Sequence, residues 1–219
     1  MTLTVHHLHV SQSERVVWLC EELGIDYELK TYKRAPILAP PEYKALHPLG
    51  AAPVIQDGDL TLAESGACIE YISHKHGNGK LFLPSTHADY ADFLYLWHWA
   101  NGTFASALMG AVASRSSEPG KQEVRAIIAK DRFKSSLVML NERVGDKTWV
   151  AGEDFTAADI ILVFLLTTVR YFYPYSLEEY PSILGYLDRI GQREAYQRAM
   201  KKCDPEMELL LGANAPARK

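Results

Sequence analysis

Two serines follow the first apolar segment of the chain, in the stretch HVSQSERV that contains Ser11 and Ser13. A serine hydroxyl can donate a hydrogen bond to an anion that forms on a bound substrate. Ser11 stands four residues before Arg15. Ser13 comes directly before Glu14 and a helical pattern, which is typical of a helix N-cap. The loop therefore offers two hydroxyls, and the N-cap role explains Ser13 better than it explains Ser11.

A second group of unusual choices lies in the stretch HPLGAAPVIQDGDLTLAESGACIEYI. Pro53 heads an apolar run, where it cannot donate a hydrogen bond to a neighbouring strand. Glu64 and Ser65 stand where a second apolar run ends and a helical pattern begins. Ser65 at a helix N-terminus offers a hydroxyl and backbone amides to a carboxylate, and Glu64 can bind an ammonium. The pair suits an amino-acid head group; the alternative is a plain serine cap beside a solvated glutamate.

Three histidines, His6, His7 and His9, raise the question of a metal site. In a strand, His7 and His9 share one face and His6 points to the other, so only two of them can bind the same ion. No acidic or cysteine partner accompanies them at the spacing of zinc sites. We therefore predict no metal.

These residues need a scaffold, and the first part of the chain alternates between strand and helix periods. The strands are expected within 3–10, 27–32, 53–56 and 60–63, and the helices within 13–23, 39–47 and 65–76. A crossover helix between the first two strands implies parallel pairing. Asp57 and Gly58 predict a hairpin, which adds an antiparallel edge. The order β-α-β-α-β-β-α is the thioredoxin-like arrangement.

Residues 78–88 contain glycine and proline breaks and are expected to be a linker. Beyond it no strand pair is apparent, and long helical patterns cover 91–113 and 125–144. Shorter helices are expected near 156–170, 180–190 and 193–202. The prediction is therefore an α/β thioredoxin-like domain at 1–77, the linker, and an all-helical domain at 89–219.

One helix start in the second domain is well specified. Thr156 and Asp159 are the two arms of a capping box, and Phe155 and Ile160 can form a hydrophobic staple. This is a folding feature, and removal of the Thr156 hydroxyl should cost about 1 kcal/mol of stability.

Composition excludes several classes of function. A net charge of −4 and a pI near 6.1 argue against nucleic-acid binding, because phosphate backbones select basic surfaces. No apolar run approaches the ~18 residues of a membrane span. The 3 cysteines are an odd number at wide spacing, which suits a reducing compartment and small buried side chains. We expect a cytoplasmic protein.

With these motifs in view, the chain resembles the glutathione S-transferase superfamily. HPLGAAPVI is similar to the family's loop before a cis-proline, and LAESGACIEYI is similar to its Glu-Ser helix start. The order of elements, the linker and the segment from Phe155 to Ile160 also match. YKRAP followed by APPEYKALHPLG resembles fungal and bacterial members most, of the serine-type, theta-like kind.

The resemblance implies that glutathione binds in an extended form across the first domain. Glu64 and Ser65 would hold the γ-glutamyl end, and the outward-facing backbone of Ala52, before a cis bond to Pro53, would pair with the cysteinyl part. Many members carry a lysine after the conserved glycine, where this chain has Ala51. The possible partners of the glycine carboxylate are therefore Arg34, Lys44 and His47.

The family activates the glutathione thiol with a Tyr, Ser or Cys in the loop after the first strand. This loop contains neither Tyr nor Cys, so the resemblance assigns the role to Ser11, with Ser13 as the alternative. A free thiol has a pKa near ~8.5, and a hydroxyl that donates to the sulfur favours the thiolate. Aromatic residues of the second domain, within 95–104 and 171–173, are expected to be mostly core, with some of them lining a cleft for a small hydrophobic electrophile.

The resemblance thus implies a homodimeric transferase that adds glutathione to electrophiles, with peroxide reduction as a related activity. One alternative is a non-catalytic binding or assembly module with the same fold. Another is the zeta-type isomerase, which carries a Ser-Ser-Cys run that VSQSERV lacks.

Overall fold

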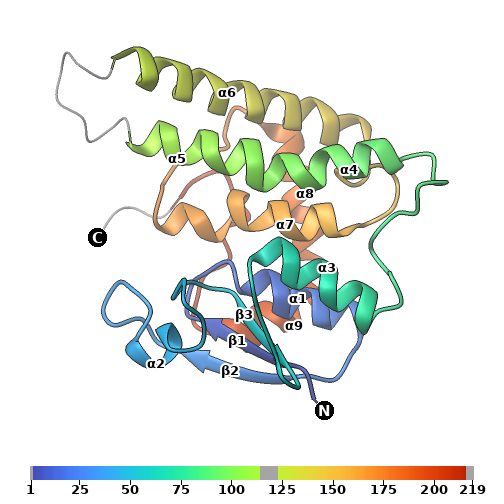
Figure 1. The fold of residues 1–219 in the computed structure, drawn as a ribbon. Helices are drawn as coiled ribbons and strands as arrows, with labels where there is room; N and C mark the ends of the chain where they lie inside the picture. The colour runs from blue at the N-terminus through green and yellow to red at the C-terminus, as the bar shows by residue number, and fades with distance from the viewer. Residues whose placement is uncertain (1, 114–122, 216–219) are drawn as a thin grey trace. The chain divides into compact units, whose positions relative to one another are not determined.

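The computed structural model describes residues 2–113 and 123–215, which form two compact units (Figure 1). The first, the α/β unit, contains Met1–Phe82 and Arg189–Leu209. The second, the helical unit, contains Leu83–Asp188 and Leu210–Lys219. The sequence-based division assigned 189–209 to the helical domain, whereas the structure groups these residues with the sheet.

The α/β unit is built on a mixed sheet of four strands in the order β2-β1-β3-β4. The strands are β1 (Thr4–Leu8), β2 (Glu28–Tyr32), β3 (Val54–Asp57) and β4 (Leu60–Ala63). β1 is parallel to β2, with Thr4 opposite Glu28, and antiparallel to β3, with His6 opposite Val54. β3 and β4 form the antiparallel hairpin that Asp57 and Gly58 predicted.

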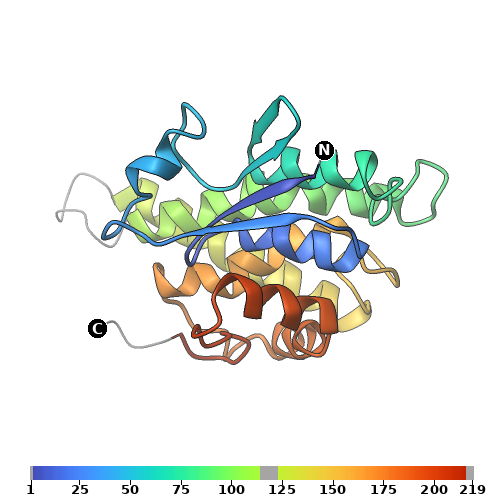
Figure 2. The ribbon, with the colours of Figure 1, turned by 90° about the horizontal axis from the view of Figure 1, so that it is seen from below.

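Helices cover both faces of this sheet. They are α1 (Glu14–Leu23), α2 (Pro41–Lys44), α3 (Ser65–Lys75) and α9 (Glu194–Cys203). α1 contacts β1 and α3, and it ends at Gly24, whose φ of 63° favours glycine. Figures 1 and 2 show α9 beside α1, and these two helices make the largest helix–helix contact of the unit.

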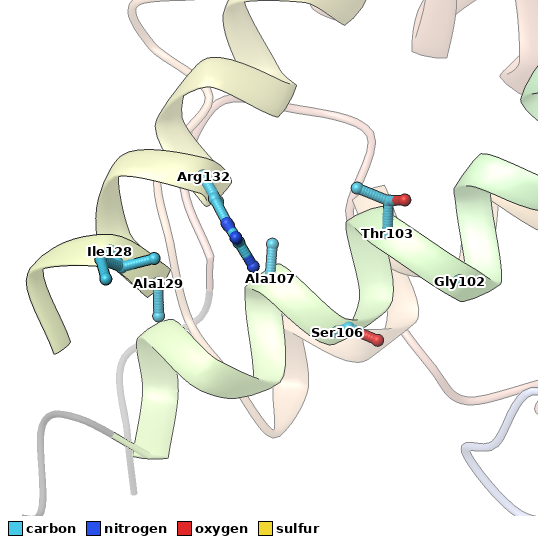
Figure 3. Close-up of a pocket in the computed structure, with 7 residues that line it drawn as sticks. All are labelled: Gly102, Thr103, Ser106, Ala107, Ile128, Ala129 and Arg132. Atoms are coloured by element: carbon cyan, nitrogen blue, oxygen red, sulfur yellow. The ribbon is translucent and has the colours of Figure 1, made fainter. Parts of the chain in front are cut away.

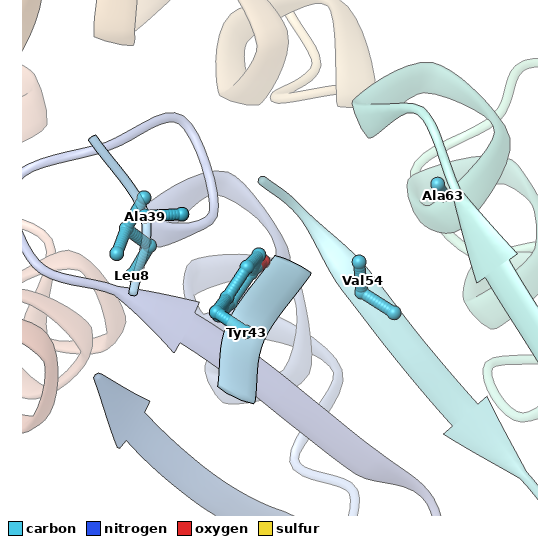
Figure 4. Packing of buried hydrophobic residues seen from close by; sticks show 5 residues of the cluster. All are labelled: Leu8, Ala39, Tyr43, Val54 and Ala63. Carbon is cyan, nitrogen blue, oxygen red and sulfur yellow. The ribbon is translucent and has the colours of Figure 1, made fainter. Parts of the chain in front are cut away.

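The opposite face of the sheet carries the short helix α2. Tyr43 of α2 is fully buried, and its hydroxyl donates to the carbonyl of His6 across 3.2 Å. Figure 4 shows Tyr43 over β1 and β3, in one buried cluster formed by Leu8, Ala39, Tyr43, Val54 and Ala63. Because side chains alternate along β1, His6 lies on this face and His7 lies on the face of α1.

Charged pairs fix α9 to α1. The guanidinium of Arg193 donates from Nε and Nη2 to the two carboxylate oxygens of Glu22, each across 2.7 Å. Glu21 accepts from Arg198 across 3.1 Å and from Lys202 across 2.5 Å. This contact explains why a helix near the C-terminus belongs to the α/β unit, since the helical pattern of the sequence could not show its partner.

The helical unit consists of α4 (Tyr90–Trp99), a π-helical turn η1 (Ala100–Phe104), α5 (Ala105–Ala113), α6 (Glu123–Asp146), α7 (Ala157–Leu166), the 3₁₀ turn η3 (Thr168–Tyr171) and most of α8 (Pro181–Gly191). α5 and α6 run side by side (Figure 1). α7 is buried along almost its whole length and contacts α4 and η1. It begins at the predicted capping box of Thr156 and Asp159, which is present.

The predicted class and element order are confirmed. The sheet has the β-α-β-α-β-β-α order of a thioredoxin-like domain, and helices make up the second unit. Cys20, Cys68 and Cys203 are buried and free, as expected. Among the helices that the structure describes, none is both long enough and apolar enough to cross a membrane.

Candidate functional site

The loop from β1 to α1 is held by two side chains from distant parts of the α/β unit. Val10 has a positive φ of 48°, which is rare for a β-branched residue. Its amide donates to the carboxylate of Asp204 across 3.2 Å. Arg34 donates to the carbonyls of His9 across 2.9 Å and of Val10 across 2.8 Å. These contacts fix the backbone immediately before Ser11.

Ser11 and Ser13 lie within hydrogen-bond distance of each other. Their Oγ atoms are 2.7 Å apart, and the amide of Ser13 donates to Ser11 Oγ across 3.3 Å. Ser13 is completely buried, whereas Ser11 retains 6% of its surface. Of the two serines, Ser11 is therefore the one closer to the surface.

The expected N-cap bond of Ser13 is absent, so that prediction was wrong. Ser13 occupies the position before α1, but its φ and ψ of −67° and −18° are helical and its side chain makes no capping bond. The hydroxyl points back toward β1, where it accepts from the amide of Leu8 across 3.1 Å and lies 2.9 Å from Nδ1 of His7. Ser13 thus connects Ser11 to the strand instead of capping the helix.

The Ala52–Pro53 peptide is cis, as predicted. The carbonyl of Ala52 does not simply face outward, because Gln12 Nε2 donates to it across 3.0 Å. Gln12 was not singled out in the sequence, although it lies between the two candidate serines. It joins the loop of Ser11 to the backbone that is expected to pair with a peptide.

Ser65 is the first residue of α3 and is 2% exposed, and the side chain of Glu64 before it makes no capping bond. It accepts from Nη1 of Arg15 across 2.9 Å, and the same atom donates to Oε1 of Gln12 across 2.8 Å. Burial lowers the pKa of Arg15 to about 9, opposed by the charge of Glu14, so the guanidinium is still positive at neutral pH. A buried cation therefore lies beside the predicted carboxylate site.

Glu64 precedes Ser65 with a φ of 73°, which a non-glycine residue adopts only at a conformational cost. Its side chain is exposed. Glu64 is the single residue between the end of β4 and the start of α3, and its carboxylate is accessible to a cation.

The three candidates for the glycine carboxylate differ in their surroundings. Arg34 already donates to three backbone carbonyls, including that of Ile37 across 2.7 Å. Lys44 is exposed, and its Cγ would lie 3.2 Å from a Cβ placed at Gly50. His47 is half-buried and accepts from the amide of Leu49 across 3.3 Å. Lys44 has the most accessible cationic group of the three.

The histidines of β1 point to opposite faces, as the alternation predicted. His6 lies 2.9 Å from the hydroxyl of Tyr32 and 3.0 Å from Oε1 of Gln56, and burial lowers its pKa. His7 and His9 each lie 3.1 Å from a carboxylate oxygen of Asp204. Within the two described ranges, no three His, Cys, Asp or Glu side chains form a cluster suited to a metal ion.

A pocket of about 380 Å³ lies in the helical unit. It is lined by Gly102, Thr103, Ser106, Ala107, Ile128, Ala129 and Arg132. Figure 3 shows Arg132 extending from α6 toward α5. None of the aromatic residues expected to line an electrophile cleft contributes to this pocket. Trp97, Trp99 and Phe104 are buried in the core, whereas Tyr95 and Phe172 are partly exposed.

The chemistry that this site supports follows from its charges and donors. Arg15 and the start of α3 favour an anion at Ser65, and the first turn of α1 favours an anion near Ser11. The Ala52 backbone and Gln12 lie between them in the hydrogen-bond network. Arg15 and Gln12 were visible in the sequence as neighbours of Ser11, but only the fold shows that they contact Ser65 and Ala52.

Comparison with known proteins places this geometry in a family. The chain matches the N-terminal domain model of glutathione S-transferases at residues 11–75 and the C-terminal domain model at 104–194. It is 30% identical to Glutathione S-transferase 3 of Schizosaccharomyces pombe, over 92% of this chain and 88% of that protein. Among solved structures, a glutathione S-transferase from Actinobacillus pleuropneumoniae has a TM-score of 0.83 and 34% identity, covering 96% and 99% of the two chains.

A theta class glutathione S-transferase from Xanthomonas axonopodis pv. citri, solved with glutathione bound, has a TM-score of 0.67 and 26% identity over 90% of this chain and 96% of that chain. Similarity at this level extends through both units, and the relatives include fungal and bacterial proteins as the motifs suggested. The chain belongs to the glutathione S-transferase family.

Proposed function

We propose that this enzyme binds glutathione at the α/β unit and transfers its thiolate to small hydrophobic electrophiles, with Ser11 as the residue that stabilises the thiolate. The observation that carries the proposal is the hydrogen-bonded group around Gln12. It joins the Ala52 carbonyl, the Arg15 guanidinium and the Ser65 hydroxyl, and it follows Ser11 directly in the chain. Such a group supports one extended ligand that touches all of these residues.

In this proposal the γ-glutamyl carboxylate of glutathione binds Ser65 and the first amides of α3. The buried charge of Arg15 strengthens that contact, because an ionic hydrogen bond is stronger than a neutral one. The γ-glutamyl ammonium pairs with Glu64, whose side chain is exposed. The cysteinyl part pairs with the backbone of Ala52, before the cis bond to Pro53, in the manner of an added strand.

The glycine carboxylate is the least specified end of the ligand. We assign it to Lys44, because the Arg34 guanidinium is already bonded to backbone carbonyls and His47 holds the turn before Gly50. Lys44→Ala should therefore weaken glutathione binding by a modest factor, whereas His47→Ala and Arg34→Lys should act mainly through the conformation of their loops.

The chemical step needs a thiolate, and the hydroxyl of Ser11 supplies a donor to it. When the thiol has lost its proton, the sulfur lone pair attacks the electrophilic carbon and a carbon–sulfur bond forms. A leaving group departs with its electron pair, or the adduct takes up a proton where the electrophile is an activated alkene. Ser11 stabilises the sulfur before the attack, since its hydrogen bond favours the anion over the thiol.

Two further features belong to this proposal. We infer a homodimer, since symmetric pairs are the commonest soluble oligomers, and light scattering that gives a monomer of 24.6 kDa at micromolar concentration would refute it. We also infer a cytoplasmic location, which fits the free cysteines. Fractionation of cells that express the tagged protein tests the location.

Conjugation of glutathione to an aryl halide tests the function. The enzyme should form the thioether product with saturation in both substrates, and Ser11→Ala should reduce the rate. A protein that binds glutathione without accelerating conjugation or peroxide reduction would instead be the non-catalytic module considered above. Running a peroxide substrate beside the aryl halide separates transfer from reduction.

A further inference from the structure

Behind Ser11, a continuous chain of hydrogen bonds leads into the interior of the α/β unit. Ser11 Oγ lies 2.7 Å from Ser13 Oγ, which lies 2.9 Å from Nδ1 of His7. Nε2 of His7 lies 3.1 Å from Oδ2 of Asp204. Ser13 and His7 are fully buried, and Asp204 is 2% exposed. Ser11 is the most exposed of these four residues, so a ligand would meet the hydrogen-bond chain at Ser11.

The donors and acceptors along this chain allow only two consistent arrangements with an ionised Asp204. The carboxylate accepts from Nε2 of His7, so that nitrogen carries a hydrogen. If His7 is neutral, Nδ1 accepts from Ser13, and Ser13 in turn accepts from Ser11. The hydrogen of Ser11 then points inward, and Ser11 can only accept a hydrogen bond from a bound thiol.

In the second arrangement His7 is an imidazolium, and every hydrogen bond in the chain is reversed. Nδ1 donates to Ser13, Ser13 donates to Ser11, and the hydrogen of Ser11 points outward. Only in this arrangement can Ser11 donate to a thiolate while the 2.7 Å contact with Ser13 remains a hydrogen bond. The donor role of Ser11 and the protonation of His7 are therefore linked.

We propose that His7 accepts the proton of the glutathione thiol through the hydroxyls of Ser11 and Ser13, and that Asp204 stabilises the resulting imidazolium; this rests on the proposed function. The S–H bond breaks and its proton passes to Ser11 Oγ. The proton of Ser11 passes to Ser13 Oγ, and that of Ser13 passes to Nδ1. One proton moves in net terms and nothing is oxidised or reduced. After conjugation the proton returns along the same hydroxyls, to the adduct or to water.

Asp204 is well placed for this role because it is fixed at the end of α9. Its amide donates to the carbonyl of Met200 across 2.9 Å, and its carboxylate also accepts from the amide of Val10. The same carboxylate lies 3.1 Å from Nε2 of His9, whose side chain is 40% exposed. A buried carboxylate against one ring nitrogen fixes the tautomer and stabilises an imidazolium that forms during the reaction, as in a Ser-His-Asp triad.

Other charges also act on this region and enter any pH profile. The charged or titratable groups that act on Asp204 or on its neighbour Cys203 are His9, Glu14, Glu21, Cys20 and Arg34. Because these groups stay in place in variants of His7, a comparison of variants isolates the effect of the proton relay, the transfer through Ser11 and Ser13 to His7.

The test measures two quantities on glutathione binding: the ultraviolet absorbance of the bound thiolate against pH, and the protons released, from calorimetry in two buffers of different ionisation enthalpy. The variants are His7→Gln, which keeps a group near Asp204 but cannot take the proton, Asp204→Asn and Ser13→Ala. The matched control is His6→Gln, which removes the neighbouring histidine from the opposite face of β1.

In the unmodified enzyme we expect bound thiolate with no net proton release to the buffer near neutral pH, because His7 keeps the proton. His7→Gln should lower the ratio of thiolate to thiol and slow conjugation roughly 10²-fold, the scale of a lost acid–base group in catalysis, with glutathione affinity changed much less. Ser13→Ala should have a comparable effect, and the double variant should be no worse than either single one. His6→Gln should leave both quantities unchanged.

Release of one proton per bound thiolate by the unmodified enzyme would overturn the relay and leave the proposed function intact. So would a His7→Gln protein that retains the full thiolate signal. If His7→Gln does not fold, Ser13→Ala and Asp204→Asn decide the matter by the same criteria. Absence of both thiolate and conjugation in the unmodified enzyme would instead overturn the proposed function, and the relay with it.

Discussion

Nη1 of Arg15 lies 2.9 Å from Oγ of Ser65, so a fully buried guanidinium from α1 contacts the first residue of α3. The same nitrogen bonds Gln12, which reaches the carbonyl of Ala52. This contact explains how residues that are far apart in the sequence form the one region at which we propose that an anion binds.

Ser65→Ala should weaken glutathione binding by roughly 1.5–3 kcal/mol, the range for a hydrogen bond to a charged group. The alternative is a role in stability alone, through the bond from Arg15, which would lower the melting temperature and leave the affinity unchanged. Titration of glutathione and thermal unfolding on the same preparation measure both effects. Ser73→Ala, which removes a buried hydroxyl later in α3, is the control and should lower stability without changing affinity. Unchanged affinity in Ser65→Ala would remove Ser65 from the site.

Arg170→Lys should destabilise the protein by about 3 kcal/mol or more, because several backbone carbonyls lose a charged donor from a buried side chain. The Arg170 guanidinium donates to Gly212 across 2.9 Å and to Ala213 across 2.6 Å, and also to Tyr175 across 3.2 Å. An ammonium cannot reproduce this planar set of donors. Urea unfolding measures the change, and Arg132→Lys at an exposed position should stay within about 0.5 kcal/mol.

Arg193→Gln should cost more stability than Arg198→Gln, although both arginines join α9 to α1. Arg193 is 26% exposed and forms a two-bond pair with Glu22, whereas Arg198 is 50% exposed; the two glutamates are equally buried. Exposed pairs contribute about 0–1 kcal/mol, and we expect Arg193 to exceed that range. Denaturant titrations of the two variants give the comparison, and an equal loss would show that the lower exposure and two-bond geometry of Arg193 have no influence.

Asp159 should make stability fall as the pH rises. Its carboxylate accepts from the amides of Val150 and Thr156 and from the hydroxyl of Tyr186, yet burial raises its pKa to about 6. Between the ordinary carboxyl pKa and this value the folded state holds a proton that the unfolded state has lost. The contribution of Asp159 therefore declines by on the order of 3 kcal/mol from pH 4 to pH 7.

The comparison that isolates this effect is the pH dependence of unfolding in the wild type and in Asp159→Asn. The free energy of unfolding of the wild type minus that of Asp159→Asn should decrease as the pH rises through this window. Asp131→Asn, on an exposed position of α6, controls for the loss of a carboxylate and should give a constant difference. If the wild-type value minus the variant value increases with pH instead, the hydrogen bonds to the Asp159 carboxylate lower its pKa more than burial raises it.

Local patterns were sufficient to predict the elements that position the site. The hairpin at Asp57 and Gly58, the breaks around residue 77 and the box at Thr156 are signals within a few residues, and the structure has each of them. Resemblance to the family added the cis bond before Pro53, which the chain alone would not favour. Hydrophobic periodicity and turn residues are local features of the sequence, so they can be recognised before the fold is known.

The contacts that complete the site are not local. Asp204 lies 197 residues from His7, and nothing around it in the sequence indicates a histidine partner. Ser13 has the sequence features of a cap, but its hydroxyl bonds the end of β1 instead. Such choices depend on which donors the tertiary structure brings close, and no periodicity encodes them.

The most direct test of the account is the thiolate of bound glutathione in Ser11→Ala. Ser11 is the accessible hydroxyl before α1, so its loss should raise the pKa of the bound thiol and slow conjugation of an aryl halide by up to about 10²-fold, the lower end for loss of a donor to a developing anion. Glutathione affinity should change much less, because Ser65 and Arg15 are untouched. A variant with unchanged thiolate absorbance at every pH and an unchanged rate of conjugation would contradict the assignment of Ser11.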